Sequence, residues 1–181
     1  MAKKRPPRNY LIEVEDDGLL AYDVGRWAED RYRRVGMYAE MFATGMKRLW
    51  DFRVYLDLFS GPGHSRMRET GRSVLGSPMI ALSLPDRFDR YIFADESRLA
   101  MEALRIRVAR AAPDADARFV PGNANKRVTS ILESIPGTDQ GSVLSFCFLD
   151  PYKLNIHFET VRRTSRSSPS TRRVCSSGRK C

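Results

Sequence analysis

The hydrophobic pattern begins with a long helical period and then changes to short apolar runs. Between Trp27 and Leu49, apolar residues recur at alternating steps of four and three: Ala28, Tyr32, Val35, Ala39, Phe42, Met46 and Leu49. This stripe predicts an amphipathic helix that packs one face on a domain. Residues 1–23 lack such a period and contain the breakers Pro6-Pro7 and Asp16-Asp17-Gly18, so we expect a loop or arm there.

Downstream, apolar runs alternate with helical patterns. We expect strands at 53–58, 90–94, 117–120 and 143–149, and helices at 73–84, 97–112, 125–135 and 154–163. Ser77 and Pro78 fit the N-cap and first position of the helix at 73–84. The last strand is nearly all apolar, which is typical of a strand covered on both faces. The alternation predicts an α/β fold with a mostly parallel sheet and right-handed crossovers.

The pattern ends abruptly after residue 163. Residues 164–181 are rich in Ser and Arg and have no apolar period, so we expect a disordered tail. The apolar strand at 143–149 would then lack the sheet partners that normally follow it. An exposed apolar edge favours association with another chain.

Charge is concentrated at the two ends of the 181-residue chain. The formal net charge is +9, yet the middle of the chain is slightly acidic, because the basic excess lies in residues 1–8 and 161–181. Two interpretations stay open: solvated flexible ends, or an arm that grips the phosphates of a nucleic acid.

The composition of the chain indicates the cellular compartment in which the protein is expected. No run approaches the ~20 apolar residues of a membrane span, and the basic start leads into no apolar segment, so we expect a cytoplasmic protein without a membrane partner. Cys147 lies in an apolar run and is expected to be buried. Cys175 and Cys181 lie in the polar tail without the spacing of zinc ligands, so no metal site is predicted.

Polar residues follow each predicted strand. The turn Asp57–Gly63 follows the first strand, Asp95-Glu96 the second, Gly122-Asn-Ala-Asn125 the third and Asp150-Pro151-Tyr152 the fourth. Carboxyl ends of parallel strands meet at one edge of a sheet, where ligands bind. Taken singly, each has a simpler interpretation, since an acid after a strand is often a helix cap and a Gly-Asn turn is often only a turn. His64, just past the turn, could meet a substrate, but it likewise fits an ordinary loop histidine.

The spacing indicates the kind of ligand. The turn lacks the third glycine of a dinucleotide-binding G-x-G-x-x-G, Asp95 lies too far downstream for that motif, and no phosphate-binding G-x-x-x-x-G-K-[S/T] is present. A ligand without a pyrophosphate, with a nucleoside and a charged amino-acid tail, fits better. We therefore expect S-adenosyl-L-methionine.

The residues also resemble a known family. Asp57-Leu-Phe-Ser-Gly-Pro-Gly63 is similar to the D-x-F-x-G-x-G motif of S-adenosylmethionine-dependent methyltransferases. Together with stretches beginning at Trp27, Gly76, Gly122 and Phe148, it resembles the three-Cys-motif partner protein family of bacteria. The resemblance implies a partial Rossmann-like methyltransferase domain at 24–163, between an arm at 1–23 and the tail at 164–181. It also implies a separate three-cysteine partner protein encoded nearby.

The resemblance assigns roles to individual residues. The methionine end of the cofactor would be held by Asp57, Ser60, Gly61 and Gly63, and Phe59 of the same turn would also bind the cofactor. Asp95, with Glu96 as the alternative, would take the ribose, and Asn123 and Asn125 would lie beside the adenine. Asp150, Pro151 and Tyr152 take the place of the (D/N/S)-P-P-(Y/F/W) motif of amino-methyltransferases, which holds an amine and stacks a planar substrate, often a flipped base. The chain has one proline where that motif has two.

Three hypotheses about function follow. The first is an S-adenosylmethionine-binding, methyltransferase-like protein that methylates an amine of nucleic acid with its partner protein. The second is a non-catalytic fragment or binding module, because family members continue with further strands where this chain turns into a Ser/Arg tail. We expect this change to reflect truncation or a frameshift. The third is a nucleic-acid-binding protein that acts through its basic tail.

Overall fold

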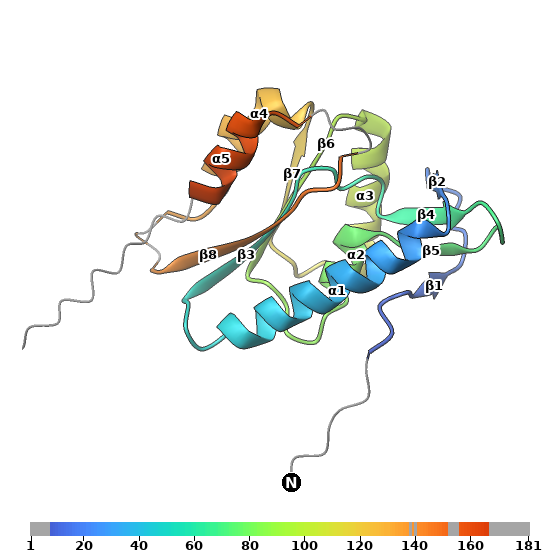
Figure 1. The fold of residues 1–181 in the computed structure, drawn as a ribbon, viewed down its shortest axis with the longest axis horizontal. Coiled ribbons are helices and arrows are strands. Elements are labelled where there is room, and N and C mark those ends of the chain that lie inside the picture. The colour runs from blue at the N-terminus through green and yellow to red at the C-terminus, as the bar shows by residue number, and fades with distance from the viewer. Residues whose placement is uncertain (1–7, 138, 140, 152–155, 167–181) are drawn as a thin grey trace, which may run out of the picture.

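A four-stranded parallel sheet forms the centre of the protein. The computed structural model describes residues 8–137, 139, 141–151 and 156–166. The sheet has the order β7 (Ala117–Pro121), β6 (Arg90–Asp95), β3 (Phe52–Asp57) and β8 (Val143–Phe148), and every neighbouring pair is parallel (Figure 1). The predicted α/β class is confirmed, and all four predicted strands are present to within one residue at each end. The arrangement is compatible with a Rossmann-like fold.

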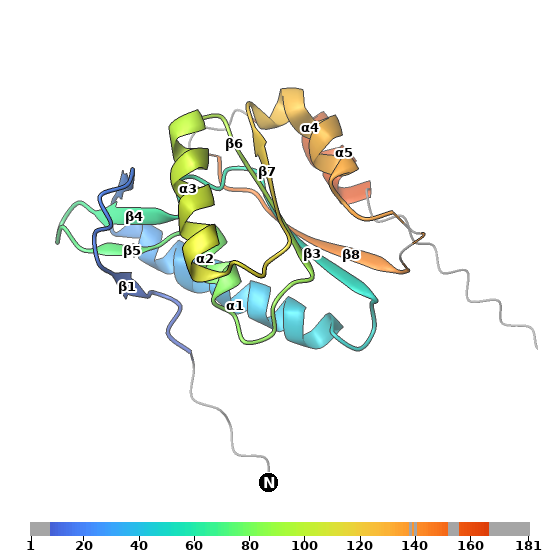
Figure 2. The same cartoon turned by 180° about the vertical axis from the view of Figure 1, so that it is seen from behind.

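Helices cover both faces of this sheet (Figures 1 and 2). One face packs against α1 (Trp27–Met46), α2 (Ser77–Leu82) and α3 (Arg98–Ala111), and the other against α4 (Ala124–Glu133), on which α5 (Phe158–Arg166) rests. The predicted helix at 27–49 ends at Met46, and the one at 154–163 becomes α5; residues 152–155 lie outside the described residues. No helix in the described ranges is long and apolar enough to cross a bilayer.

The pleat of the strands gives the two faces different cores. Tyr55 of β3 stacks on Phe146 of β8 with ring centroids 5.8 Å apart, and Phe42 of α1 meets Phe146 at 5.3 Å. The opposite face is aliphatic, with Leu56 and Ile131 fully buried. Alternate residues of a strand point to opposite faces, so a sheet covered on both sides buries both sets.

The order of the strands creates a switch point. From β3 the chain runs outward through β6 to β7, and then returns to add β8 on the other side of β3. Crevices that hold ligands in open parallel sheets form beyond the carboxyl ends of the strands at such a reversal. The turn after Asp57 lies at this place.

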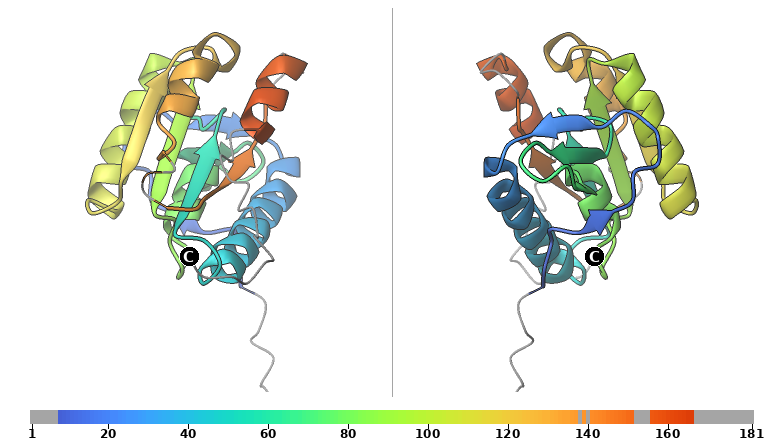
Figure 3. Two further views of the ribbon diagram at one scale, coloured as in Figure 1. Left: turned by 90° about the vertical axis from the view of Figure 1, so that its left-hand side faces the viewer. Right: turned by 90° about the vertical axis from the view of Figure 1, so that its right-hand side faces the viewer.

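A second, smaller sheet was not predicted. It has the order β1 (Glu13–Val14), β5 (Ser73–Leu75), β4 (His64–Met67) and β2 (Tyr22–Val24), and faces the viewer in the right-hand panel of Figure 3. Glu13–Val14 and Tyr22–Val24 therefore form strands where we expected only a loop or arm. Strands of two to four residues are too short to show an alternation of apolar and polar residues in the sequence. They are stabilised instead by pairing with segments distant in sequence, such as Tyr22 with Ser65.

Two local expectations were wrong in the same region. The expected helix at 73–84 is a strand followed by a shorter helix, whose N-cap is Gly76 rather than Ser77. The side chain of Ser77 instead donates a hydrogen bond to Asp57. His64 lies on β4 and not in a loop. These corrections share one cause, since contacts between distant segments override local capping and turn preferences.

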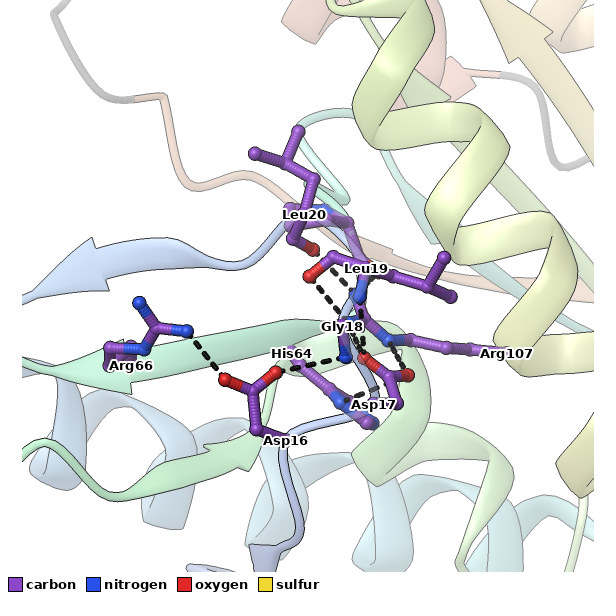
Figure 4. A network of polar contacts seen from close by, with 9 residues as sticks. Asp16, Asp17, Gly18, Leu19, Leu20, His64, Arg66 and Arg107 are labelled. Carbon is purple, nitrogen blue, oxygen red and sulfur yellow. Dashed lines mark hydrogen bonds and ion pairs between the residues drawn. The ribbon is translucent and has the colours of Figure 1, made fainter.

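Arg107 on α3 holds the N-terminal segment and the glycine turn together (Figure 4). Its buried guanidinium donates to both carboxylate oxygens of Asp17, at 2.8 and 2.5 Å, and to the carbonyls of Leu20 and Pro62, both at 2.7 Å. The hydrogen bonds from Arg107 lower the pKa of Asp17 to about 2. One side chain therefore joins three segments that are distant in sequence.

We expect Arg107→Met to destabilise the protein strongly, because it removes a buried cation and leaves the Asp17 carboxylate without its guanidinium partner. Breaking such a pair typically lowers the free energy of unfolding by about 3 kcal/mol or more. Urea denaturation would measure the loss. Arg110→Met, one turn away on the exposed face of α3, is the matched control and should change stability little. Equal losses in the two variants would contradict this assignment.

Candidate functional site

Asp57 ends β3 with its side chain sealed from solvent. It is 0% exposed, accepts a hydrogen bond from Ser77 Oγ at 2.6 Å, and accepts another from the Phe59 N–H at 3.2 Å. Burial raises the pKa of Asp57 to about 7, although these two hydrogen bonds oppose the shift. The carboxyl group joins the turn after β3 to the start of α2 and is not on a cavity wall.

The turn itself requires glycine at two positions. Gly61 and Gly63 have φ of 60° and 90°. A Cβ on Gly63 would lie 2.8 Å from Leu104 Cδ1, and the Gly63 carbonyl accepts the Gly76 N–H at 2.7 Å. Gly61 faces the ring of Tyr22, which a Cβ would meet at 3.4 Å. The turn is thus packed between α2, α3 and the N-terminal segment, with its backbone close to the space beside Tyr22.

Asp95 connects the end of β6 to the same turn. Its carboxylate accepts the Gly61 N–H and the Ser97 N–H, each at 2.9 Å on a different oxygen. Burial raises the pKa of Asp95. Each oxygen keeps a second lone pair, so the group can still accept hydroxyl donors. Glu96, the alternative acid, is exposed and lies 3.5 Å from the amide nitrogen of Asn123.

A cavity of about 650 Å³ opens at the switch point. This is the size of a typical small-molecule site. Of the predicted residues, its wall includes Phe59, Ser60, Gly61, Gly63, Asp95, Asp150 and Pro151. Segments that end three different strands therefore meet around one space, as the sequence predicted. Tyr152 lies outside the described residues.

The two asparagines do not reach this cavity. The Asn123 side chain caps α4 by accepting the Asn125 N–H at 3.0 Å. The Asn125 side chain accepts from the His157 N–H at 2.9 Å and from Thr160 Oγ1 at 2.8 Å, which holds α5 against α4. Their expected place beside an adenine is therefore not on the cavity wall. The simpler interpretation, a turn that caps a helix, describes Asn123.

Sequence reasoning missed part of the wall. The small sheet and the start of α1 contribute Tyr22, Trp27, Arg31 and Tyr32. Trp27 is 54% exposed, and the Arg31 guanidinium lies 3.9 Å from the centre of the Trp27 ring. Arg31 also forms an ion pair with Asp150. The available signal was that Trp27 and Arg31 are four residues apart and off the apolar stripe, where an aromatic–cation pair meets on a helix surface.

His64 lies on the same wall and is buried. Its Nδ1 is 3.8 Å from a carboxylate oxygen of Asp17. Burial lowers the pKa of His64, and the nearby Arg107 lowers it further. The neutral imidazole is therefore favoured at neutral pH.

Comparison with known proteins adds no family assignment. A scan against models of protein families found no match, and a search of curated proteins found none either.

The substitution Asp57→Asn tests whether the pKa of the buried Asp57 carboxyl is raised. Because the pKa of Asp57 is raised to about 7 in the folded protein, the folded state binds the proton more tightly than the unfolded state between pH 4 and 7. The contribution of Asp57 to stability therefore falls as pH rises through this window. Relative to Asp57→Asn, the wild-type protein should lose about 2–3 kcal/mol between pH 5 and 8, at roughly 1.4 kcal/mol for each pH unit. Urea denaturation across that range would measure it.

Asp30→Asn, at an exposed position on α1, is the control for this experiment. Its stability should run parallel to that of the wild-type protein across the range. A constant difference between the wild-type protein and Asp57→Asn would contradict the raised pKa.

A matched pair of glycine variants tests the packing of the turn. Gly63→Ala and Gly71→Ala both place a Cβ at positive φ, which is unfavourable by about 1–2 kcal/mol. Only at Gly63 does the Cβ collide with a buried side chain, whereas nothing lies within 4 Å at Gly71. Gly63→Ala should therefore be less stable than Gly71→Ala by a further ~1–3 kcal/mol in thermal or urea unfolding. Equal stabilities would show that the turn is loosely packed.

Proposed function

We propose that this chain is an S-adenosylmethionine-binding, methyltransferase-like protein. One observation carries the proposal: a glycine turn at the switch point of a parallel sheet is held to Asp95, and both line a cavity of about 650 Å³. The proposal extends the resemblance to the three-Cys-motif partner family, including a three-cysteine partner protein and a cytoplasmic location.

The residues on the wall fit the proposed cofactor. Gly61 carries no side chain where the turn borders the cavity, so a ligand can approach the backbone of residues 60–63. The free lone pairs of Asp95 suit the two hydroxyls of a ribose. Asp57 would act indirectly, because its buried carboxyl fixes the turn through the Phe59 N–H. When bound, S-adenosylmethionine supplies an activated methyl group.

Asp150 and Pro151 line the part of the same cavity where the methyl-accepting substrate would bind. They follow β8, on the opposite side of β3 from Asp95. The Asp150 carboxylate can accept hydrogen bonds from an amine, orient its nitrogen and receive the proton that the amine releases. Alignment of this kind can supply much of the catalysis when the leaving group is already reactive. We therefore propose an amine of nucleic acid as the methyl acceptor.

Calorimetry with S-adenosylmethionine tests the binding claim. The wild-type protein should give saturable heat. Gly61→Ala should weaken binding at least about tenfold, because its Cβ would lie 3.4 Å from the Tyr22 ring on the cavity wall and its φ of 60° becomes strained. Gly71→Ala, with a φ of 69° and no part in the cavity, should bind like the wild-type protein.

Two outcomes would reject the proposal. One is an absence of heat with folded wild-type protein at high concentration. The other is equal binding by the two glycine variants, which would place the ligand away from the turn.

A further inference from the structure

The wall of the cavity already carries a planar, nitrogen-rich group, the guanidinium of Arg31. Arg31 extends from α1 so that its guanidinium lies over the Trp27 ring, with 3.9 Å between the guanidinium carbon and the ring centre. The same guanidinium forms an ion pair with Asp150. About 29% of the Arg31 side chain and 28% of the Asp150 side chain remain exposed, so the pair lines the cavity without being sealed inside the protein.

The chemistry of this contact is specific. A guanidinium offers a flat face for stacking and N–H donors in the same plane. The amino edge of adenine or cytosine offers the same combination, a flat ring and an N–H₂ donor. Trp27 and Asp150 therefore satisfy both requirements of an unpaired amino-bearing base: a stacking platform and a carboxylate acceptor.

We propose that Trp27 and Asp150 form the acceptor subsite for an unpaired adenine or cytosine base, and that Arg31 occupies this subsite until the base displaces it. The inference rests on the proposed function and narrows its substrate to the amino-bearing bases of single-stranded nucleic acid. Trp27, Arg31 and Asp150 line the same cavity as Gly61 and Asp95, so the base would enter the space that holds the methyl donor.

Exposed arginines at the start of α1 favour a nucleic-acid strand as the carrier of the base. Arg26 precedes α1, and the first turns of the helix contain Arg31, Arg33 and Arg34. Arg33 is balanced by Glu29 and Asp30, at 3.6 Å from each. The exposed arginines of α1 attract the phosphates of a strand, while the cavity wall itself carries Arg31 and Arg68 beside Asp23, Asp95 and Asp150. The exposed face of Trp27 adds base stacking, which does not depend on a particular sequence.

The position of Arg31 predicts how its removal changes the affinity for a base. A base that enters must displace the Arg31 guanidinium from the Trp27 ring and from Asp150. Removing the guanidinium while keeping a similar apolar stem should therefore strengthen base binding. Removing the Trp27 ring should weaken it. Opposite effects from two adjacent cavity residues distinguish occupancy of a subsite from a general loss of structure.

Trp27 fluorescence gives a direct measurement. The chain has two tryptophans, so Trp50→Phe leaves Trp27 as the only reporter. The probe is a single-stranded dA 12-mer, compared with an abasic 12-mer that has the same phosphates. Basic segments bind both probes, so the difference between them reports the base. We expect saturable quenching by dA beyond that of the abasic strand, in the complete chain and without S-adenosylmethionine.

Variants complete the test, with affinity read from the anisotropy of labelled strands. Arg31→Met should raise base-dependent affinity at least about threefold, and Trp27→Ala should lower it at least about tenfold. Trp27→Phe should keep an intermediate affinity. Arg34→Met, at a neighbouring exposed arginine, should affect dA and the abasic strand alike.

Several results would overturn the subsite. They are unchanged or weaker dA binding by Arg31→Met, wild-type affinity in Trp27→Ala, or stronger quenching by N-acetylarginine amide than by the dA strand. Failure of the proposed function is separate, because it appears as absent S-adenosylmethionine heat in the wild-type protein. Intact cofactor binding without base-dependent quenching would reject the subsite alone.

Discussion

The burial of the Asp57 carboxyl is the constraint on which the carboxyl end of the sheet depends. A carboxyl group with no solvent access must have partners, and its partners here come from the turn that follows it and from the start of α2. Those two hydrogen bonds bring Gly63 and Gly76 together, and the Gly61 N–H then reaches Asp95 of the neighbouring strand. The geometry of the cavity wall follows from one buried acid at the end of the central strand.

Arg107 adds a second fixed point from the opposite side of the turn. It binds the Pro62 carbonyl and, with the same guanidinium, the N-terminal segment that leads to Tyr22. The segment that places the Tyr22 ring against Gly61 is therefore held by a hydrogen bond from α3 to the Leu20 carbonyl. This attachment explains how the N-terminal segment, which is distant in sequence from the turn, contributes Tyr22, Asp23 and Val24 to the cavity wall.

Sequence reasoning succeeded where the signal is local and periodic. The apolar runs predicted the four strands of the parallel sheet, and polar residues at three strand ends meet at the cavity. It failed where pairing between distant segments decides the structure, as with β1, β2 and β4, which have almost no pattern of their own. Asn125 shows the same limit, because nothing local indicates that its side chain serves α5. The ion pair of Arg31 with Asp150 joins residues too far apart in sequence for any motif to indicate.

The position of β8 affects the order in which the protein can assemble. Phe52 pairs with Val143, so the central strand waits for one of its two neighbours until most of the chain has been synthesised. Pairing between such distant segments closes a large loop and is slow compared with local contacts. During that interval β3 has β6 beside it but an open edge on the other side, with Tyr55 lacking the ring of Phe146. We expect the crevice at the switch point to be completed last, and the nascent chain to be most vulnerable to aggregation just before β8 docks.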